Sequence, residues 1–328
     1  MPRRTTPVAP ALLSVRHKRA IAASLLVAAI LYLIIVISSG SANVFAAIAR
    51  LDLLVWLTLL LCSLANYLLR YFRWQYYLRL FGHSLPHRQH FIYYLAGFAL
   101  TTTPGKSGEV IRSVLLRPYG IPYPHSIAAF FTERLLDVIL VALLALLTML
   151  VIDRFILFII SISIVVVAVL PLLRHPYTHV LLRRWQTRLS PSRRQRLLGH
   201  LRNLLRKARR LLAARPLYIG LLLGFAAWSM QGIAFAFLLS QMGLTIPFAL
   251  AFGIYATSLL VGAASFLPGG VGTTEATLIV LLTLLGTDTA TAVAVAVVSR
   301  LMTLWFAVSL GLLATAYISL RRSSPSLP

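Results

Sequence analysis

Long apolar runs, separated by short polar or basic stretches, dominate this chain. Six of them approach or exceed the roughly 20 residues that a membrane-spanning helix needs: residues 20–37, 51–69, 127–151, 155–173, 217–239 and 290–317. Hydrophobic residues make up 59 % of the sequence, whereas soluble domains are roughly half apolar. We therefore expect an all-α, polytopic integral membrane protein with about six spanning helices.

Two further apolar segments, residues 91–116 and 248–286, are interrupted. A helix over residues 91–103 covers only about 20 Å of a hydrocarbon core about 30 Å thick, which predicts a re-entrant hairpin. Residues 249–266 are long enough to span, so the second segment is either a hairpin or two full spans. Two hairpins would form an inverted pair that meets near the bilayer midplane, as in many secondary transporters.

Both interrupted segments contain the same order of residue types, a Pro-Gly pair, a further Gly and then a Glu. The residues are Pro104, Gly105, Gly108 and Glu109 in the first copy, and Pro268, Gly269, Gly270, Gly272 and Glu275 in the second. An Arg follows each Glu after 25 residues, at Arg134 and at Arg300. Pro removes a backbone donor and Gly relaxes the chain, and the freed backbone groups need protein or water around them. We expect both breaks to line one water-accessible cavity with both Glu–Arg pairs, and Gly105 to lie near Gly269.

Charged side chains inside the apolar segments are the candidate chemistry. A charge at the bilayer centre costs about 2.5–3.5 kcal/mol on insertion scales, so such residues normally pair or line a wet cavity. Guanidinium forks and the N-termini of broken helices both suit phosphate. We predict a binding site for a phosphate-bearing headgroup made of Glu109, Arg112, Arg134, Asp137, Glu275 and Arg300. The alternative is that these Glu and Arg side chains pair only to hold helices together.

The distribution of basic residues predicts the orientation. The chain has 31 Lys and Arg against 7 Asp and Glu, and most basic residues lie in 1–19, 70–90, 117–125, 174–216 and 318–328. The positive-inside rule then places both termini in the cytoplasm, with the protein in the cytoplasmic membrane. The expected organisation is a basic N-terminus (1–19), a transmembrane domain (20–320) and a tail (321–328). Within the domain, one repeat at about 51–173 and another at about 217–320 flank the cytoplasmic segment 174–216.

Segment 174–216 contains leucines at three- and four-residue steps between Leu197 and Leu212, with arginines off that face. This pattern predicts a basic amphipathic helix on the anionic inner leaflet, and a solvated loop is the alternative. Nucleic-acid binding is not expected, because the aromatic interleaving of strand binders is missing.

A second expectation concerns the aromatic residues near the end of the second apolar run, which we interpret as an interfacial belt. They are Tyr67, Tyr71, Phe72, Trp74, Tyr76 and Tyr77.

Metal, cofactor and nucleotide motifs are missing from the sequence. The eight histidines and the single Cys62 form no metal-ligand spacing, and no phosphate-binding Gly-rich loop is present. We therefore expect no metal and no cofactor. A membrane enzyme that uses Glu109 and Glu275 as acid and base is disfavoured, because no nucleophile or metal set accompanies them.

Three strings resemble the lysylphosphatidylglycerol synthase transmembrane-region family, a flippase-like membrane domain. They are the segments 103–112 (TPGKSGEVIR), 132–137 (TERLLD) and 267–275 (LPGGVGTTE), in the right order. The similarity covers roughly residues 20–320. It implies an inner-membrane protein that moves, or helps to move, polar lipids between leaflets.

The resemblance sets the functional expectation, a flippase-like transporter of a polar or anionic lipid. Its expected partners are membrane lipids with phosphate headgroups and, in addition, a lipid-modifying enzyme. The alternative is a non-transporting subunit that anchors a lipid-modifying enzyme or a glycosyltransferase. In the synthases of this family a soluble aminoacyl-transferring domain follows the membrane domain. The present sequence ends at Pro328, so transferase activity is not expected. The resemblance does not identify the lipid, the energy source or the oligomeric state.

Overall fold

The computed structural model describes residues 41–103, 108–150, 156–175, 177, 180, 184 and 193–323. Regular structure in this part of the chain is helical throughout. The predicted first span, residues 20–37, and the first Pro-Gly pair, Pro104 and Gly105, lie outside the described residues.

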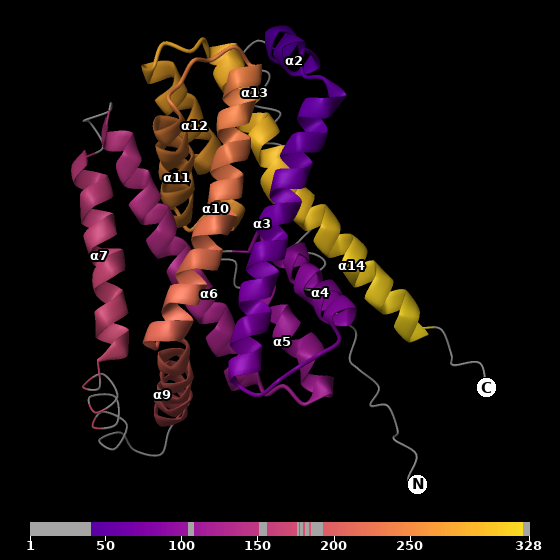
Figure 1. The fold of residues 1–328 in the computed structure, drawn as a ribbon, viewed down its shortest axis with the longest axis vertical. Helices are drawn as coiled ribbons and strands as arrows, with labels where there is room; N and C mark the ends of the chain where they lie inside the picture. The colour runs from indigo at the N-terminus through magenta and orange to yellow at the C-terminus, as the bar shows by residue number, and fades with distance from the viewer. Residues whose placement is uncertain are drawn as a thin grey trace.

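Figure 1 shows the order of the helices along the chain. The first half contains α2 (Ser41–Ala49), α3 (Leu53–Leu80), α4 (His87–Ala96) with the 3-10 turn η1 (Gly97–Leu100), α5 (Ile111–Leu116), η3 (Arg117–Tyr119), α6 (Tyr123–Ala145), η4 (Leu146–Leu150) and α7 (Ile156–Arg174). The second contains α9 (Arg193–Leu211), α10 (Ala214–Gln241), α11 (Phe248–Ala264), η6 (Pro268–Gly270), α12 (Thr273–Leu284), α13 (Thr289–Arg300), the π-helical turn η7 (Leu301–Trp305) and α14 (Phe306–Ser323).

Three helical stretches of the described chain are long and apolar enough to cross a membrane. They are α3, α10 and the joined helices over Thr289–Arg321. The helix α11 and the stretch Pro268–Leu284 are apolar but shorter. Together with the expected runs at α6 and α7, these helices support a multi-pass membrane protein. Figure 1 shows α3 and α10 packed side by side, and the chain runs downward in one and upward in the other.

Helices of the first and second halves begin at two similar intervals. The helices α3 and α10 each have 28 residues, and their first residues, Leu53 and Ala214, lie 161 positions apart. The same interval separates Pro86 and Pro247, which precede α4 and α11. Beyond the breaks, α6 begins at Tyr123 and α13 at Thr289, an interval of 166.

One hydrogen bond joins two positions related by this interval. The Asn66 side-chain Nδ2 donates to the carbonyl oxygen of Ala227 at 2.6 Å, and the two residues are 161 positions apart. Asn66 lies on α3 and Ala227 on α10. Corresponding positions of the two helices therefore meet where α3 and α10 cross.

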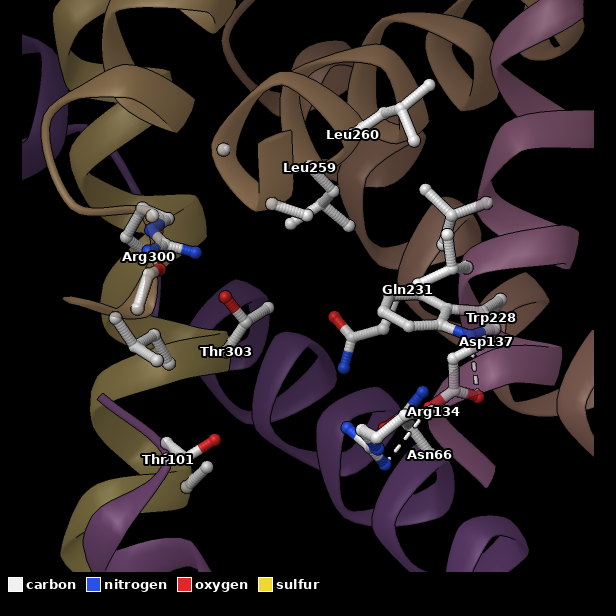
Figure 2. Close-up of a pocket in the computed structure, with 18 of the residues that line it drawn as sticks. Asn66, Thr101, Arg134, Asp137, Trp228, Gln231, Leu259, Leu260, Arg300 and Thr303 are labelled. Carbon is white, nitrogen blue, oxygen red and sulfur yellow. Dashed lines mark hydrogen bonds and ion pairs between the residues drawn. The ribbon is translucent and has the colours of Figure 1, made fainter. Parts of the chain in front are cut away.

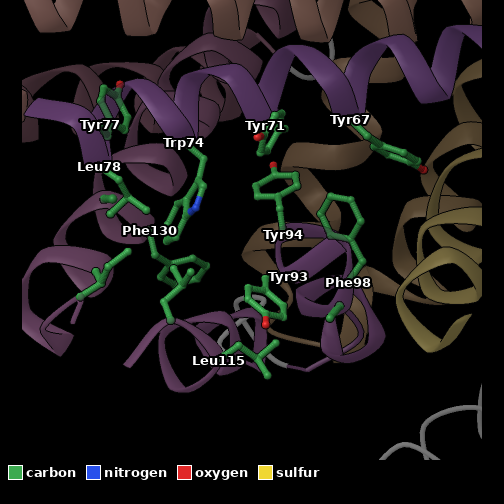
Figure 3. Packing of buried hydrophobic residues seen from close by; sticks show 14 of the residues in the cluster. Tyr67, Tyr71, Trp74, Tyr77, Leu78, Tyr93, Tyr94, Phe98, Leu115 and Phe130 are labelled. Carbon is green, nitrogen blue, oxygen red and sulfur yellow. The ribbon is translucent and has the colours of Figure 1, made fainter. Parts of the chain in front are cut away.

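The aromatic residues of α3 form a buried core and not an interfacial belt. Figure 3 shows Tyr67, Tyr71, Trp74 and Tyr77 facing rings from the following helices. All four are at most 3 % exposed, whereas Phe72 is 47 % exposed. They recur at three- and four-residue steps, so they share one helical face. The expectation of a belt is wrong for these four residues, because that face packs against α4, α5 and α6.

The second break depends on left-handed backbone that favours glycine. After α11 the φ angles of Gly269, Gly270 and Gly272 are 64°, 65° and 86°, in a region where side chains other than glycine are strained. A Cβ on Gly269 would lie 3.4 Å from the Cα of Thr102. The second break therefore touches the turn that leads into the first break.

The amphipathic helix predicted in segment 174–216 is present as α9. Its apolar residues Ala208 and Leu211 are buried, and the helix packs against α6. Arg206 and Arg209 are exposed. The apolar face is thus covered, at least in this part, by another helix of the same chain.

Candidate functional site

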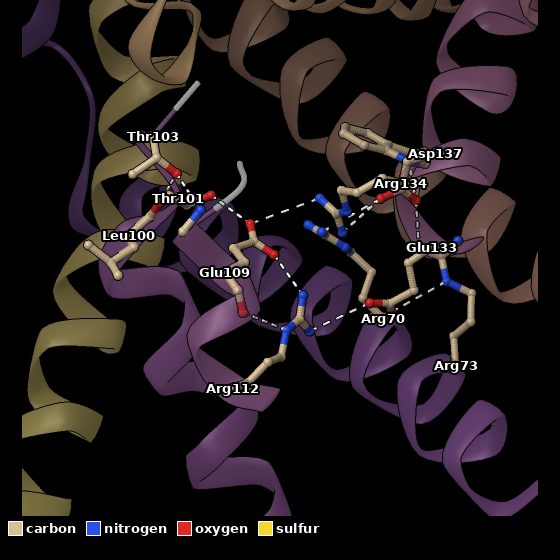
Figure 4. Close-up of polar contacts among 12 residues, drawn as sticks. Arg70, Arg73, Leu100, Thr101, Thr103, Glu109, Arg112, Glu133, Arg134 and Asp137 are labelled. Carbon is tan, nitrogen blue, oxygen red and sulfur yellow. Dashed lines mark hydrogen bonds and ion pairs between the residues drawn. The ribbon is translucent and has the colours of Figure 1, made fainter. Parts of the chain in front are cut away.

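A cluster of seven charged side chains lies where α3, α5 and α6 meet (Figure 4). Four guanidinium groups and three carboxylates form ion pairs with one another. The cations are Arg70, Arg73, Arg112 and Arg134, and the anions are Glu109, Glu133 and Asp137. This first cluster therefore carries one positive charge in excess.

Arg70 and Arg73 were missed as site residues, because the basic segment 70–90 was assigned to the cytoplasm. Both lie within α3 and are buried. Arg73 Nη2 lies 2.6 Å from Asp137 Oδ1, and Arg70 Nη2 lies 3.6 Å from Asp137 Oδ2. The spacing contains a signal, since Ser63, Asn66, Arg70 and Arg73 recur at three- and four-residue steps. This periodicity marks one polar face of a long helix.

The predicted pair in the first half is present in space. Arg134 Nη1 lies 3.9 Å from Glu109 Oε1, and the same oxygen accepts a hydrogen bond of 2.8 Å from the Thr101 hydroxyl. The other carboxylate oxygen accepts from Arg112 Nη2 at 2.8 Å. Glu109 therefore connects the residues before the first break to α5 and α6.

Arg112 is enclosed by aromatic rings. Its guanidinium carbon lies 4.4 Å from the ring centroid of Trp74, 4.7 Å from that of Tyr94 and 5.5 Å from that of Phe130. The residue is 0 % exposed. Cation–π contacts stabilise a desolvated guanidinium by about 2 kcal/mol or more. Arg112 thus lies behind the charged cluster, inside the aromatic core.

The ion-pair distance of the predicted pair in the second half is shorter. Arg300 Nε lies 2.8 Å from Glu275 Oε1, and Arg300 Nη2 donates to the Gly269 carbonyl oxygen at 2.6 Å. The backbone N–H of Gly272 donates to Glu275 Oε2 at 2.8 Å. Glu275 therefore accepts an N–H at the start of α12, where the first amides of a helix need partners. The pair also holds the second break against α13.

The π-helical turn after Arg300 is fixed by α3. Its carbonyl oxygens at Met302 and Thr303 accept hydrogen bonds of 2.6 Å each, from the hydroxyls of Ser63 and Tyr67. A π turn leaves the regular hydrogen-bond register of an α-helix, and such turns are frequent at functional sites. Side chains of α3 therefore determine the position at which α13 presents Arg300.

A cavity of about 230 Å³ lies between the two pairs. Figure 2 shows Arg300 on one side of it and Arg134, Asp137 and Gln231 on the other. Among the predicted site residues, Arg134, Asp137, Arg300, Gly269 and Gly270 line this cavity. Glu109, Arg112, Glu275, Gly108, Pro268 and Gly272 do not line it, and the two glutamates instead hold the arginines from behind.

The lining residues occur in pairs at the two recurring intervals. Pairs that are 161 positions apart are Tyr67 and Trp228, Arg70 and Gln231, Phe98 and Leu259, and Thr101 and Gly262. Pairs that are 166 positions apart are Arg134 and Arg300, Asp137 and Thr303, Val138 and Leu304, and Val141 and Ala307. Both halves of the chain thus contribute residues at these two intervals to one cavity.

The cavity combines charge with an apolar wall. Arg70, Arg134, Arg300 and Asp137 are its charged lining residues, and leucine, valine and aromatic side chains make up much of the rest. Such a surface can hold a polar group together with an apolar one. No group of His, Cys, Asp and Glu suited to a metal ion occurs among the described residues.

Comparison with protein-family models gives a match over most of the chain. A family model described as lysylphosphatidylglycerol synthase TM region matches residues 21–311. A search of curated proteins finds no significant match. The matched range contains both breaks, both Glu–Arg pairs and every residue that lines the cavity.

Proposed function

Because this chain belongs to the lysylphosphatidylglycerol synthase transmembrane-region family, we propose that it is a flippase-like transporter. In this proposal it moves a polar or anionic lipid between the leaflets of the cytoplasmic membrane. One observation carries the proposal, namely that both halves contribute corresponding residues to a single cavity with an arginine on each side.

The recurring elements support an inverted repeat as the basis of transport. The helices α3 and α10 have equal lengths and run in opposite directions (Figure 1). Inverted repeats place the binding site at their common interface, where broken helices supply backbone groups. Rocking of one half against the other then opens the site to one leaflet at a time. In this scheme the broken segments are paired hairpins, in addition to about six spanning helices.

Each part of the cavity has a place in the mechanism. Arg134 and Arg300 bind the phosphate oxygens of the headgroup, since a guanidinium fork matches two oxygens. The glutamates behind them fix the forks, through the 3.9 Å and 2.8 Å contacts. The apolar wall separates the bound headgroup from the acyl-chain region of the bilayer. The acyl chains of the transported lipid stay in the bilayer.

Reconstitution of the purified chain into vesicles tests the proposal. Vesicles that contain an acyl-labelled phospholipid should show faster exchange between leaflets than protein-free vesicles. Arg134→Gln and Arg300→Gln should each slow this exchange about tenfold or more, because a charge-assisted hydrogen bond is lost. The matched control is Arg209→Gln, which changes an exposed arginine of α9 and should leave the rate unchanged.

The same experiment separates the proposal from its alternative. A folded, correctly inserted chain that moves no lipid would be a membrane anchor for another protein. Normal exchange by both cavity variants would show that the Glu–Arg pairs serve only to hold the helices together.

A further inference from the structure

The two halves of the chain contribute different charges to the cavity, although many lining residues form pairs at the intervals of 161 and 166 positions. Arg70 of the first half corresponds to Gln231 of the second, and Asp137 corresponds to Thr303. Only Arg134 and Arg300 match in charge. The first half thus supplies two cations and an anion, and the second supplies one cation.

Arg134 has two atoms, Nε and Nη2, without a hydrogen bond among the described residues, but its Nη2 lies 3.0 Å from Asp137 Oδ2. Arg70 has the more distant ion pair of the two. The residue is 5 % exposed, and its Nε and Nη2 atoms make no hydrogen bond within the described part of the chain. Its Nη2 lies 3.6 Å from Asp137 Oδ2, beyond hydrogen-bond distance. A buried guanidinium with unmet donors is costly, and an anion in the cavity would satisfy them.

Asp137, by contrast, is already surrounded by donors. Its carboxylate lies 2.6 Å from Arg73 Nη2 and 3.0 Å from Arg134 Nη2. The indole Nε1 of Trp228 donates to it at 3.2 Å. The other carboxylates of the two clusters also face guanidinium groups. Within the described residues, the cavity therefore offers an incoming ammonium group no carboxylate that lacks a cation.

Gln231 adds an acceptor on the side of the cavity where Arg134 and Asp137 lie (Figure 2). It is 4 % exposed, and its amide oxygen makes no hydrogen bond among the described residues, while its Nε2 donates to the Ser63 hydroxyl at 3.3 Å. A buried amide oxygen in a cavity suits a hydroxyl donor. The cavity thus combines unmet cationic donors with one neutral acceptor.

We propose that the cavity selects lipids with a net negative headgroup, a phosphodiester that bears a neutral hydroxylated group, and rejects aminoacylated, cationic ones. Arg70 is the residue that distinguishes the anionic headgroup from the cationic one. This inference rests on the proposed function and narrows its substrate class. The selection requires only binding of the headgroup and no chemical step.

A competition experiment on the purified full-length chain in detergent tests the selectivity. An acyl-labelled phosphatidylglycerol serves as the probe, and unlabelled phosphatidylglycerol and lysylphosphatidylglycerol compete with it. We expect phosphatidylglycerol to compete about tenfold or more better, as one charge-assisted hydrogen bond implies. Equal or better competition by the lysylated lipid would overturn the inference.

Variants connect the selectivity to Arg70. Arg70→Gln should bring the two lipids close to parity, whereas Arg79→Gln, an exposed residue of the same helix, should keep the preference. If Arg70→Gln does not fold, Gln231→Glu gives a separate readout, since an additional carboxylate in the cavity should raise the affinity for the lysylated lipid. An unchanged preference in Gln231→Glu, or in folded Arg70→Gln, counts against the assignment.

Two further measurements distinguish failure of the selectivity proposal from failure of the transport proposal. Inorganic phosphate should compete weakly, and competition as strong as that of the lipid would assign the cavity to a free anion. The vesicle assay, run with labelled versions of both lipids, separates selectivity from transport. Selective binding without exchange refutes only the transport proposal, whereas exchange that favours the lysylated lipid refutes only the selectivity.

Discussion

Arg73 and Arg134 belong to the same charged cluster and have different surroundings. The side chain of Arg73 is 0 % exposed, whereas that of Arg134 is 15 % exposed and lines the cavity. Both pair with Asp137. Burial therefore separates a residue that holds the fold from one that can meet a ligand.

Replacement of Arg73 should test this difference through stability. Arg73→Met leaves Glu133 and Asp137 with fewer cations, and loss of one partner of a buried pair costs about 3–5 kcal/mol. We expect a marked fall in the unfolding temperature in detergent. Arg134→Met should lower it less, because solvent in the cavity partly replaces the lost cation. Equal stability of Arg73→Met and the unmodified chain would contradict this account.

Individual residues also show which contacts can be predicted from the sequence. The equal intervals from Glu109 to Arg134 and from Glu275 to Arg300 predicted two pairs, and both lie within ion-pair distance. Arg70 was assigned to the cytoplasm because counting basic residues assumes that a helix ends soon after about 20 residues. A 28-residue helix is about 42 Å long, so its later turns can be buried against other helices.

At the scale of elements, α10 approaches α3 through glycines. A Cβ on Gly224 would lie 2.5 Å from Arg73 Nη1 and 2.7 Å from Leu140 Cδ1. A Cβ on Gly97, beside Arg112, would meet its nearest atoms at 3.4 Å and 3.5 Å. The first position has no room for a methyl group, and the second has ordinary contact distances.

This comparison gives a paired prediction about packing. Gly224→Ala should displace Arg73 from Asp137 and destabilise the chain by about 1–3 kcal/mol, the usual cost of overpacking. Gly97→Ala should have a smaller effect. Unfolding temperatures of the two variants in the same detergent measure the difference. A more stable Gly224→Ala than Gly97→Ala would show that α10 can move away freely.

The N-terminus of α13 allows a test of helix capping. The Asp288 side chain accepts a hydrogen bond of 3.0 Å from Thr291 N–H, whereas Asp52 before α3 makes no capping bond with its side chain. Asp288→Ala should cost about 1 kcal/mol, and Asp52→Ala should cost less. Thermal unfolding at neutral pH compares them, and equal losses would contradict a capping role.

The capping bond also predicts a pH dependence. The Thr291 backbone N–H lowers the pKa of the Asp288 carboxyl below its ordinary value. A lowered folded-state pKa contributes stability above the unfolded pKa of about 4, and this contribution is lost as the pH falls through the folded value. The difference between Asp288→Ala and the unmodified chain should therefore shrink below about pH 4. A difference that grows on acidification would contradict this sign.

The breaks show the limit of prediction for elements. Pro and Gly indicated where the helices stop, because these residues remove a donor or relax the backbone. The left-handed φ of 55° at Phe266 had no signal in the residue type. The buried face of α3 had one, a three- and four-residue periodicity, but a cluster of aromatic residues suits both a core and an interface.

At the scale of the whole molecule, the orientation in the membrane remains a prediction from charge. Figure 1 places α9 and α2 at opposite ends of the molecule. His200 on α9 and Arg50 after α2 are both exposed. In a Cys62→Ala background, an impermeant maleimide should label Arg50→Cys in intact cells and His200→Cys only after permeabilisation. Labelling of His200→Cys from outside intact cells would defeat the predicted orientation.

The overall architecture was the most accessible part, since apolar runs and the family strings cover nearly the whole chain. Sequence patterns placed α10 and the last long helix within a few residues. They predicted a cavity at the two breaks but did not indicate most of its lining, because the lining combines residues from α3, α6, α10, α11 and α13 that lie far apart along the chain. Such contacts depend on how helices cross, and local periodicity does not determine this.

The change from one recurring interval to the other has a consequence for how the two halves can differ in length. The interval is 161 up to Thr101 and Gly262 and 166 from Glu109 and Glu275 onward. The five extra residues therefore lie between Gly262 and Glu275, a stretch that contains the second break together with the end of α11 and the start of α12. A residue added inside a helix would rotate every later side chain by about 100°, whereas irregular backbone transmits no such rotation. A difference in length that is confined to irregular backbone therefore leaves unchanged the faces that the flanking helices turn toward the cavity.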